Sequence, residues 1–593
     1  PMINPETRDC QNCKSRFTIE PEDFDLFKKL GVPPPTFCVE CIYQRQLSFR
    51  NARNLYRRAD SMTGKELISI YSPDKKMNVI ESKAWHGDSW DPLSYGRDYD
   101  FGRPFFEQIG ELIHEVPFPA VNNWDAVNSD YCNFSKGNKN CYLVFGGDFN
   151  EDTQYSAYNF YTKNSSDLYW VNKGELCYEL VDSEGNYRTS FGRYLSSCVD
   201  THFGFELSGC QNCIGCLNLR NQSHCFFNQK LSAQEYAEKV KEIDFGSYRT
   251  TQELQTKFNE LYKKSIFRPF KIMSSVNSTG DNIYNAKNCK NCFDIFDGAE
   301  DCKHILLAAG GLKDSYGCGH LGAKSELIYD SLSIYPASNV IASWMVIDGH
   351  HIQHSINITN CSNLFGCVGM RNKQYCILNK QYTKEEYEAL VPKIVEHMKK
   401  MPYRGKGGRV YGYGEFFPTE ISPFAYNETI ASEYFPLTKE EVEKTGFVWK
   451  EREGKEYVAT IKTADIPDNI KDVEDSILNE VVECEHHGKC TDGCTTAFKI
   501  IPAELAFYRH MPLPLPRLCP NCRNAQRIKR RNPPKLWHKK CVCAGASSQN
   551  NAYQNTVKHS HDAQPCPNEF ETTYPPERPE IIYCEACYNA EVV

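Results

Sequence analysis

Cysteines near both ends of the chain occur in paired sets whose spacing is typical of metal sites. In each set, 24 residues separate the first pair from a Cys-x-x-Cys pair. Four thiolates held by a short hairpin converge on a tetrahedral ion, which suits Zn²⁺. So small a module lacks a sufficient core of its own, which disfavours metal-free buried thiols. The two sets are Cys10, Cys13, Cys38 and Cys41, and Cys490, Cys494, Cys519 and Cys522.

These two sets belong to copies of one module, related by a constant offset of 481 residues from Cys13 to Arg58. Apolar, proline and arginine positions match as well as cysteines, and Tyr56 becomes Trp537. The offset implies duplication of a folded unit. The matched residues are Phe17, Ile19, Pro21, Pro33, Pro35, Arg50, Asn51 and Leu55 with Phe498, Ile500, Pro502, Pro514, Pro516, Arg531, Asn532 and Leu536.

A third, degenerate copy closes the chain. Cys566 precedes Phe570 by four residues, as the second cysteine does in both other modules, and Cys584-x-x-Cys587 supplies the second pair. The first ligand is absent from its usual place. Cys541, Cys543 or His561 must fill it, and the sequence leaves the choice open. The three modules therefore predict two to three Zn²⁺ per chain.

The modules resemble the probable zinc-ribbon family. The resemblance covers Cys490, Cys494, Phe498, Glu504, Tyr508, Pro516, Cys519, Cys522 and Arg523. The additional residue between Cys490 and Cys494 departs from the family pattern, and Cys484 is an alternative first ligand. The whole chain also resembles large cysteine-rich proteins of uncultured bacteria that end in such a ribbon. This resemblance implies zinc and brings no activity with it.

Basic residues follow the second cysteine pair in both intact modules and suggest nucleic-acid binding. Guanidinium groups bind phosphates bidentately, and an aromatic ring can stack on an unpaired base. Structured RNA is the favoured partner, with the ribosome as one candidate, because ribbons can recognise RNA shape. The alternative is a basic face that packs against the acidic body or a partner protein. The candidate residues are Arg523, Arg527, Arg530, Arg531, Lys535 and Trp537, and Arg50, Arg53, Arg57 and Arg58.

The middle of the chain contains a second duplication, in which residues 132–243 match residues 283–394 at an offset of 151. Short strand-like segments alternate with turns rich in Asn, Gly and Ser. This pattern predicts a mainly β fold with two β-solenoid lobes, and a pair of Greek-key sandwiches is the alternative. Ser232 with Glu235 and Thr383 with Glu386 form capping boxes that predict a helix at the end of each lobe.

The central cysteines are expected in the core. Cys213 becomes Leu364 and Cys177 becomes Ile328 in the second copy. A ligand cannot be exchanged for an aliphatic residue, whereas a buried thiol behaves as a small hydrophobe. His350, His351 and His354 have no counterpart in the first copy and are expected at the surface.

Composition restricts the remaining possibilities. A net charge of −8 argues against a chain that coats nucleic acid along its length. No apolar stretch is long enough to span a bilayer, and the first residues show no secretion signal. We therefore expect a cytoplasmic protein without a membrane partner, in which the 29 cysteines are reduced. Its oligomeric state is left open.

The predicted domains place ribbons around the solenoid lobes. Because the chain lacks the nucleophile-elbow, phosphate-loop and His-Glu-x-x-His motifs, we expect a protein that is not an enzyme. Two other hypotheses are a protein-interaction scaffold with structural zinc and a polysaccharide-processing β-helix enzyme. The predicted boundaries are 1–60 (ribbon), 61–119 (linking segment), 120–245 (first lobe), 246–274 (helical linker), 275–402 (second lobe), 403–483 (extended segment and tether), 484–540 (ribbon) and 541–593 (degenerate ribbon).

Overall fold

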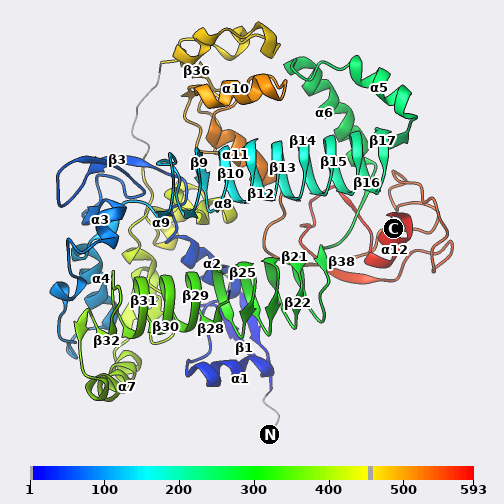
Figure 1. The fold of residues 1–593 in the computed structure, drawn as a ribbon. Coiled ribbons are helices and arrows are strands. Elements are labelled where there is room, and N and C mark those ends of the chain that lie inside the picture. Colours follow the sequence, from blue (N-terminus) through cyan, green and yellow to red (C-terminus); the bar gives the residue numbers. More distant parts are fainter. Residues whose placement is uncertain (1–3, 323, 452–457, 593) are drawn as a thin grey trace.

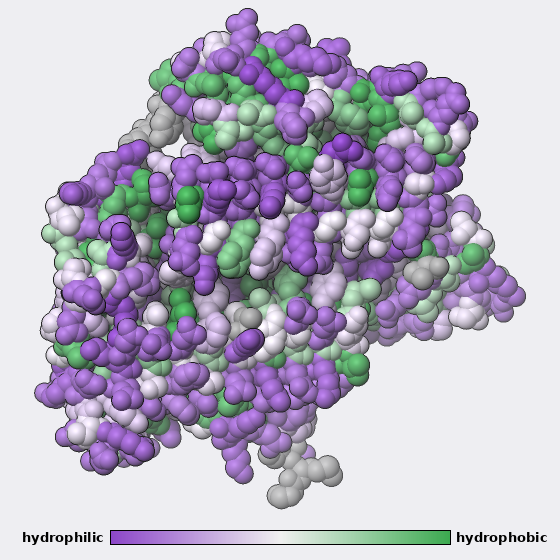
Figure 2. Space-filling view, viewed as in Figure 1, coloured by the Kyte–Doolittle hydropathy of each residue, from purple (hydrophilic) through white to green (hydrophobic). Residues whose placement is uncertain are grey.

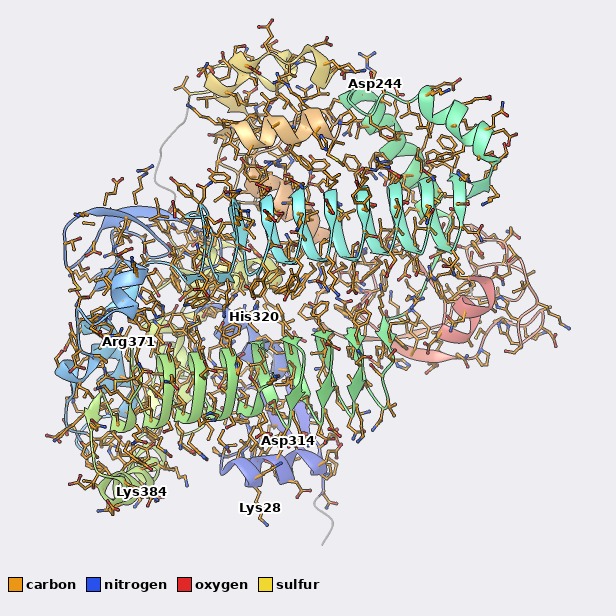
Figure 3. The ribbon with its side chains drawn as sticks, viewed as in Figure 1. Lys28, Asp244, Asp314, His320, Arg371 and Lys384 are labelled. Atoms are coloured by element: carbon orange, nitrogen blue, oxygen red, sulfur yellow. The ribbon has the colours of Figure 1, made fainter. Side chains whose placement is uncertain are left out.

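Two β-solenoid lobes dominate a computed structural model that describes residues 4–322, 324–451 and 458–592. The lobes lie side by side and run in opposite directions (Figure 1). Trp170 of lobe 1 stacks on Phe296 of lobe 2 with ring centroids 4.7 Å apart. His320 of lobe 2, which lies between the lobes in Figure 3, has its ring 5.7 Å from that of Tyr158 in lobe 1. The predicted mainly β fold with two solenoid lobes is confirmed.

Lobe 1 repeats every 12 residues, and one such repeat is one coil of the solenoid. Each strand pairs in parallel with the strand that lies 12 residues later. Cys177 lies beside Thr189, Thr189 beside Thr201, and Thr201 beside Cys213. The strands are β7 (Asn123–Trp124), β8 (Ser135–Lys136), β9 (Tyr142–Phe145), β10 (Glu151–Phe160), β11 (Lys163–Ser166), β12 (Tyr169–Asn172), β13 (Glu175–Glu184), β14 (Tyr187–Ser196), β15 (Val199–Ser208), β16 (Gln211–Arg220), β17 (Ser223–Phe226) and β18 (Gln229–Lys230).

Each coil has four short sides, because a left-handed residue recurs at every third position. In one coil these residues are Leu176, Glu179, Asp182 and Gly185, with φ between 49° and 66°. Non-glycine residues adopt this region infrequently. The residue after each corner points inward and is buried, as Cys177 and Leu180 are.

The interior of such a coil is narrow and accepts only small or slender side chains. A Cβ atom on Gly192 would lie 2.3 Å from Leu195. Serine and asparagine side chains at inward positions accept backbone hydrogen bonds from the next coil: Ser183 Oγ accepts from Leu195 N at 3.1 Å. Thiols suit this space as small apolar groups, and every cysteine from Cys132 to Cys376 is buried. The core prediction for these residues is confirmed.

Lobe 2 follows the same design with a less regular repeat. Val346 pairs with Ile358 at a spacing of 12, whereas Ile305 pairs with Cys318 at 13. Its strands are β20 (Ile272–Met273), β21 (Gly280–Tyr284), β22 (Ala286–Lys287), β23 (Cys292–Phe296), β24 (Ala299–Glu300), β25 (Lys303–Ala309), β26 (Leu312–Lys313), β27 (Tyr316–Leu321), β28 (Glu326–Tyr329), β29 (Leu332–Ile341), β30 (Trp344–Gln353), β31 (Ile356–Phe365), β32 (Gln374–Ile377) and β33 (Lys380–Gln381).

Each lobe ends in the predicted helix. Helix α5 (Ala233–Lys241) begins with the Ser232–Glu235 capping box, and α7 (Lys384–Lys400) begins with the Thr383–Glu386 box. Helix α6 (Tyr248–Lys263) connects the lobes within the predicted helical linker. Strand β19 (Ile266–Phe267) continues that linker and pairs with β40 (Ile581–Ile582) of the third ribbon.

The ribbons share one plan of a hairpin followed by a helix that starts at a cysteine. Cys38 and Cys519 are the N-caps of α2 and α11. The N-terminal ribbon has β1 (Glu6–Asp9), β2 (Arg16–Ile19), α1 (Pro21–Leu30) and α2 (Val39–Leu47). The second has β36 (Val482–Glu483), β37 (Ala497–Phe498), α10 (Pro502–His510) and α11 (Pro520–Lys529). The third has β38 (Trp537–Lys540), β39 (Glu569–Thr572), β40 and α12 (Glu585–Val592).

The segments between ribbons and lobes are packed. Residues 61–119 form β4 (Glu66–Ser69, paired with β3, Tyr56–Ala59), β5 (Val79–Ile80), α3 (Ser82–His86), α4 (Phe105–Glu115) and β6 (Phe118–Pro119). Residues 403–449 carry β34 (Tyr403–Arg404), β35 (Val410–Tyr411), α8 (Ala431–Tyr434) and α9 (Lys439–Thr445).

The predicted tether is only partly covered by the structure, because 452–457 lie outside the described residues. Beyond them, Ile466, Ile470, Val473 and Ile477 are buried in the core of the second ribbon. That part of the segment is therefore a packed extension of the ribbon, and the tether prediction is wrong there. Apolar residues spaced three or four apart were the overlooked signal. No helix in the described part of the chain is long and apolar enough to cross a bilayer.

Candidate metal centres and ribbon interfaces

Three groups of four cysteines bring their sulfur atoms within 4.8 Å of one another. The first is the predicted set of Cys10, Cys13, Cys38 and Cys41. The Cys13 and Cys38 sulfurs are 3.6 Å apart. A tetrahedron with metal–sulfur bonds of about 2.3 Å has edges of about 3.8 Å, so this spacing fits a bound metal ion.

The second group contains Cys484, Cys494, Cys519 and Cys522. Cys484 takes the position expected for Cys490 because it directly follows strand β36, as Cys10 follows β1. Cys490 instead lies with His486 near Cys522, whose sulfur is 3.6 Å away. The hairpin loop of the second module is longer than that of the first, so the first ligand no longer lies 481 residues after its counterpart. The cysteine spacing alone therefore favoured Cys490.

The third group contains Cys541, Cys566, Cys584 and Cys587. Cys541 is therefore the fourth member that the sequence left open among three residues. Cys543 and His561 belong to a neighbouring group with His559, and that group also includes Cys587. Each cysteine group can thus hold a metal ion.

One thiol in each group has a lowered pKa because neighbouring thiols donate hydrogen bonds to its sulfur. Cys38 and Cys41 lower the pKa of Cys10, and Cys484 and Cys522 lower that of Cys519. The Cys541 thiol lowers the pKa of Cys584 to about 4. Because the thiolate is the ligand form, each group offers a metal cation a negatively charged first ligand at neutral pH.

The four arginines of α11 and its C-terminal end face acidic side chains of the lobes. Arg527 is 0% exposed and donates to Asp167 at 2.8 Å and Glu179 at 2.7 Å. Arg523 is 4% exposed and donates to Asp167 at 2.9 Å. In this structure Arg523 and Arg527 cannot reach a phosphate from outside.

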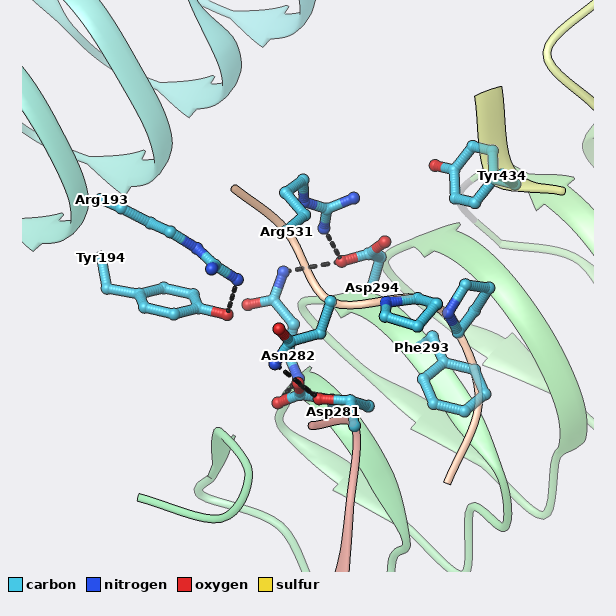
Figure 4. A pocket seen from close by; sticks show the side chains of 12 residues that line it. Arg193, Tyr194, Asp281, Asn282, Phe293, Asp294, Tyr434 and Arg531 are labelled. Carbon is cyan, nitrogen blue, oxygen red and sulfur yellow. Dashed lines mark hydrogen bonds and ion pairs between the residues drawn. The ribbon is translucent and has the colours of Figure 1, made fainter. Parts of the chain in front are cut away.

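The two arginines that follow α11 also have acidic partners, and one of these partners lies in lobe 2. Arg531 donates to Asp182 of lobe 1 at 2.9 Å and also to Asp294 of lobe 2. Arg530, which pairs with Glu179, keeps 36% of its side chain exposed. Figure 4 shows the junction around Arg531, where a cavity of about 20 Å³ has room for about one water molecule.

The basic residues of the N-terminal ribbon are also engaged within the chain. Arg50 is buried, stacks on Phe134 at 3.6 Å and donates to Ser333 at 2.7 Å. Arg53 pairs with Glu433 at 3.5 Å. Arg58 donates to two backbone carbonyls, while Arg57 is exposed beside Glu66.

Lys535 and Trp537 lie close together after the second ribbon. Lys535 pairs with Glu40 of the N-terminal ribbon at 2.8 Å, and its amine is 5.7 Å from the centre of the Trp537 ring. Trp537 is half-buried on β38, opposite Thr572.

The two ribbons dock on the two lobes through equivalent contacts. Gln46 of α2 donates to Asp330 of lobe 2 at 2.7 Å, and its counterpart Arg527 donates to Glu179, the counterpart of Asp330. Arg50 donates to Ser333, and its counterpart Arg531 donates to Asp182, which is the counterpart of Ser333 in lobe 1. Phe27–Tyr329 and Tyr508–Tyr178 repeat one edge-to-face contact with centroids 5.8 Å apart.

The molecule is therefore a pseudo-dimer of ribbon–lobe units, and its units are crossed along the chain. The N-terminal ribbon precedes lobe 1 but docks on lobe 2, while the second ribbon follows lobe 2 and docks on lobe 1 (Figure 1). The offsets of 481 and 151 each appeared in the sequence, but neither indicated which ribbon contacts which lobe.

Of the three central histidines that were expected at the surface, two are exposed and one is buried. His350 and His351 are exposed, as predicted. His354 is fully buried, and its Nε2 accepts a hydrogen bond from Gly414 N at 3.3 Å. Burial lowers the pKa of His354 to about 3, so this imidazole is neutral. The surface prediction is wrong for His354 because helix α4 and residues 413–414 cover this side of the lobe.

A cleft of about 670 Å³ opens between lobe 1, helix α6 and the second ribbon. Figure 2 shows a mainly hydrophilic face on which hydrophobic residues gather toward the upper part, over α10 and α6. Aromatic rings and guanidinium groups line the cleft together, among them those of Phe191, Tyr248, Phe258, Arg517, Arg530 and Arg578. Only Arg530 of the predicted nucleic-acid residues lines this cleft with substantial exposure.

Comparisons with known proteins assign no family. No family model matches the chain, and no curated protein matches it. One solved structure, from Desulfovibrio desulfuricans G20 and proposed to be an acetyltransferase, is 10% identical with a TM-score of 0.09, covering 66% of this chain and 83% of that chain. Similarity at this TM-score carries no argument about fold or function.

Proposed function

We propose that this chain is a non-enzymatic scaffold in which zinc ribbons clamp two β-solenoid lobes into one rigid body that binds a partner protein. The observation that carries the proposal is the burial of ribbon arginines against lobe carboxylates. Arg527 forms ion pairs with Asp167 and Glu179, and Arg531 forms ion pairs with Asp182 and Asp294. Such contacts fix the position of each ribbon on a lobe and leave the outer faces for docking.

Zinc is the metal we propose for the cysteine groups. Sets of four thiolates favour Zn²⁺ or iron–sulfur clusters, and the hairpin-and-helix setting matches structural zinc sites. Because the four thiolates of a ribbon come together around the ion, metal binding contributes to the folding free energy of the ribbon. Removing the metal is then expected to release the clamp.

Hydrogen exchange on the full-length chain tests the clamp. Chelation of the metal should increase deuterium uptake in α2 and α11 and also in β10, β12, β13 and β27, the lobe strands that contact these helices. Strands β17 and β32 are the internal control, because their helix contacts are with α5 and α7. Uptake that rises only within the ribbons would contradict the clamp.

Purification of the tagged chain from its native cells, with and without nuclease, tests the scaffold role. A protein partner should remain bound after nuclease treatment. If every co-purified component is lost with the nucleic acid, the scaffold proposal fails.

Binding of single-stranded nucleic acid is the second candidate, and the aromatic cleft is the observation that favours it. Bases stack on aromatic rings and guanidiniums bind phosphates. Fluorescence anisotropy with a single-stranded RNA would then show weaker binding for Arg530→Glu. Arg188→Glu is the matched control, because Arg188 is 51% exposed, pairs with Asp200 and does not line the cleft. Equal binding by both variants would contradict this candidate.

A further inference from the structure

The three ribbon hairpins differ mainly in the loop between their first two cysteines. The first cysteine directly follows a strand in each ribbon: Cys10 after β1, Cys484 after β36 and Cys541 after β38. The second cysteine lies three residues before the next strand. Between these cysteines lie two residues in the first ribbon, nine in the second and 24 in the third.

The longest loop brings its own potential ligands to the third ribbon. Cys543, His559 and His561 lie on this loop and gather around Cys587, with all four ligand atoms within 4.8 Å of one another. The Cys543 sulfur is 3.2 Å from His559 Nδ1, and the Cys587 sulfur is 3.3 Å from His561 Nε2. The group is therefore complete without a residue from outside the module.

Both imidazoles are held by their other ring nitrogen, as metal-binding histidines usually are. His559 Nε2 lies 2.8 Å from a Glu591 carboxylate oxygen, and His561 Nδ1 lies 2.6 Å from the Gln564 carbonyl oxygen. The Glu591 side chain is fully buried and accepts hydrogen bonds from Thr556 and Tyr553. These contacts select the tautomers that direct a lone pair toward the sulfurs.

Only Cys587 belongs to both four-ligand groups of this module. If a single ion occupied the four-cysteine group, Cys543 and His559 would be buried ligands without a metal. A thiolate sulfur has enough lone pairs to bind two ions. Two Zn²⁺ ions with five thiolates and two neutral imidazoles carry a net charge of −1, against −2 for one Zn²⁺ with four thiolates.

We propose that the third ribbon holds a binuclear zinc centre in which Cys587 bridges the two ions. One ion is bound by Cys541, Cys566, Cys584 and Cys587, and the other by Cys543, His559, His561 and Cys587. This inference rests on the proposed zinc ribbons and extends them. Cys522 is the counterpart of Cys587 in the second ribbon, where the shorter loop brings only His486 and Cys490 toward it.

Metal analysis and cadmium NMR of the full-length chain test the bridge. We expect four zinc ions per chain. In the ¹¹³Cd-substituted protein, two ¹¹³Cd resonances should be split by scalar coupling through the shared sulfur. His559→Gln should remove one metal ion and abolish this splitting. His538→Asn is the matched control, because His538 lies on β38 of the same module, is exposed and pairs with Glu569 and Glu571.

Each outcome separates the bridge from the wider zinc assignment. Three zinc ions per chain, unchanged in His559→Gln, would overturn the bridge and leave the ribbons intact. Four zinc ions without cadmium–cadmium splitting would also overturn it. Less than about one zinc ion per chain, after purification without chelator, would overturn the proposed zinc scaffold itself.

Discussion

Replacing Arg527 with methionine removes the cation at the centre of the contact between the second ribbon and lobe 1. The Arg527 side chain is 0% exposed and binds Asp167, Glu179 and the Tyr155 carbonyl. Removal of one partner from a buried ion pair costs about 3–5 kcal/mol of unfolding free energy. Asp167 and Glu179 keep Arg523 and Arg530 as partners. We therefore expect the lower end of this range, about 3 kcal/mol.

The assay is urea unfolding of the zinc-loaded chain, with Lys529→Met as the matched control. Lys529 is adjacent in sequence to this cluster but 63% exposed, and it pairs with Asp492. The Asp492 side chain is 6% exposed, so loss of this pair should cost about 1 kcal/mol, the upper end of the range for surface pairs. Arg527→Met should therefore unfold at clearly lower urea than Lys529→Met. If the two variants agree within about 1 kcal/mol, the ribbon is not clamped as the structure indicates. If Arg527→Met loses RNA binding without losing stability, that result would support nucleic-acid binding and contradict the clamp.

Three further outcomes follow from other sites. Cys519→Ser should lower the zinc content by one ion, whereas Cys213→Ser should retain all zinc and cost about 1–2 kcal/mol, by metal analysis and urea unfolding. His354 has a folded pKa of about 3, so between pH 6.5 and 3 the unfolded chain binds a proton that the folded chain does not, and stability falls as pH falls. Between pH 7 and 4.5 the free energy of unfolding should therefore fall by about 2–3 kcal/mol less in His354→Gln than in the parent chain. If the free energy of unfolding depends on pH in the same way in both proteins, His354 is not buried as the structure indicates. Gly280→Ala should destabilise lobe 2 by more than about 4 kcal/mol, because its φ is 137° and the new Cβ would lie 1.7 Å from the Cys292 carbonyl oxygen; a soluble variant with parental stability would refute this.

The sequence predicted the solenoid lobes because their duplication preserved both polar corners and small inward residues. The exchange of Cys213 for Leu364 correctly placed the central cysteines in the core. The 12-residue coil was missed, because its signal is a period of three in which both apolar and small polar residues occupy the inward positions. Cys177, Leu180, Ser183 and Asn186 occupy successive inward positions of one coil. No ordinary strand or helix pattern describes such a series.

The ribbon sites were predicted well where loops kept their length. The first set was complete, whereas the insertion before Cys494 pointed to Cys490 instead of Cys484. The fate of the arginines could not be predicted, because their partners Asp167, Glu179 and Asp182 lie more than 300 residues away in sequence. A run of cations looks the same whether it will meet phosphate or buried carboxylate.

The crossed order of ribbons and lobes constrains how the chain can fold during its synthesis. Gln46 of the N-terminal ribbon binds Asp330, which is 284 residues later in the sequence. At roughly 5–20 residues per second, a ribosome needs about 15–60 s to make that stretch. Throughout this time the ribbon has no lobe to dock on, while lobe 1 can already stack coil by coil. Early metal binding would keep the N-terminal ribbon folded while it waits for lobe 2, so the supply of that metal during translation would help to determine the yield of folded protein.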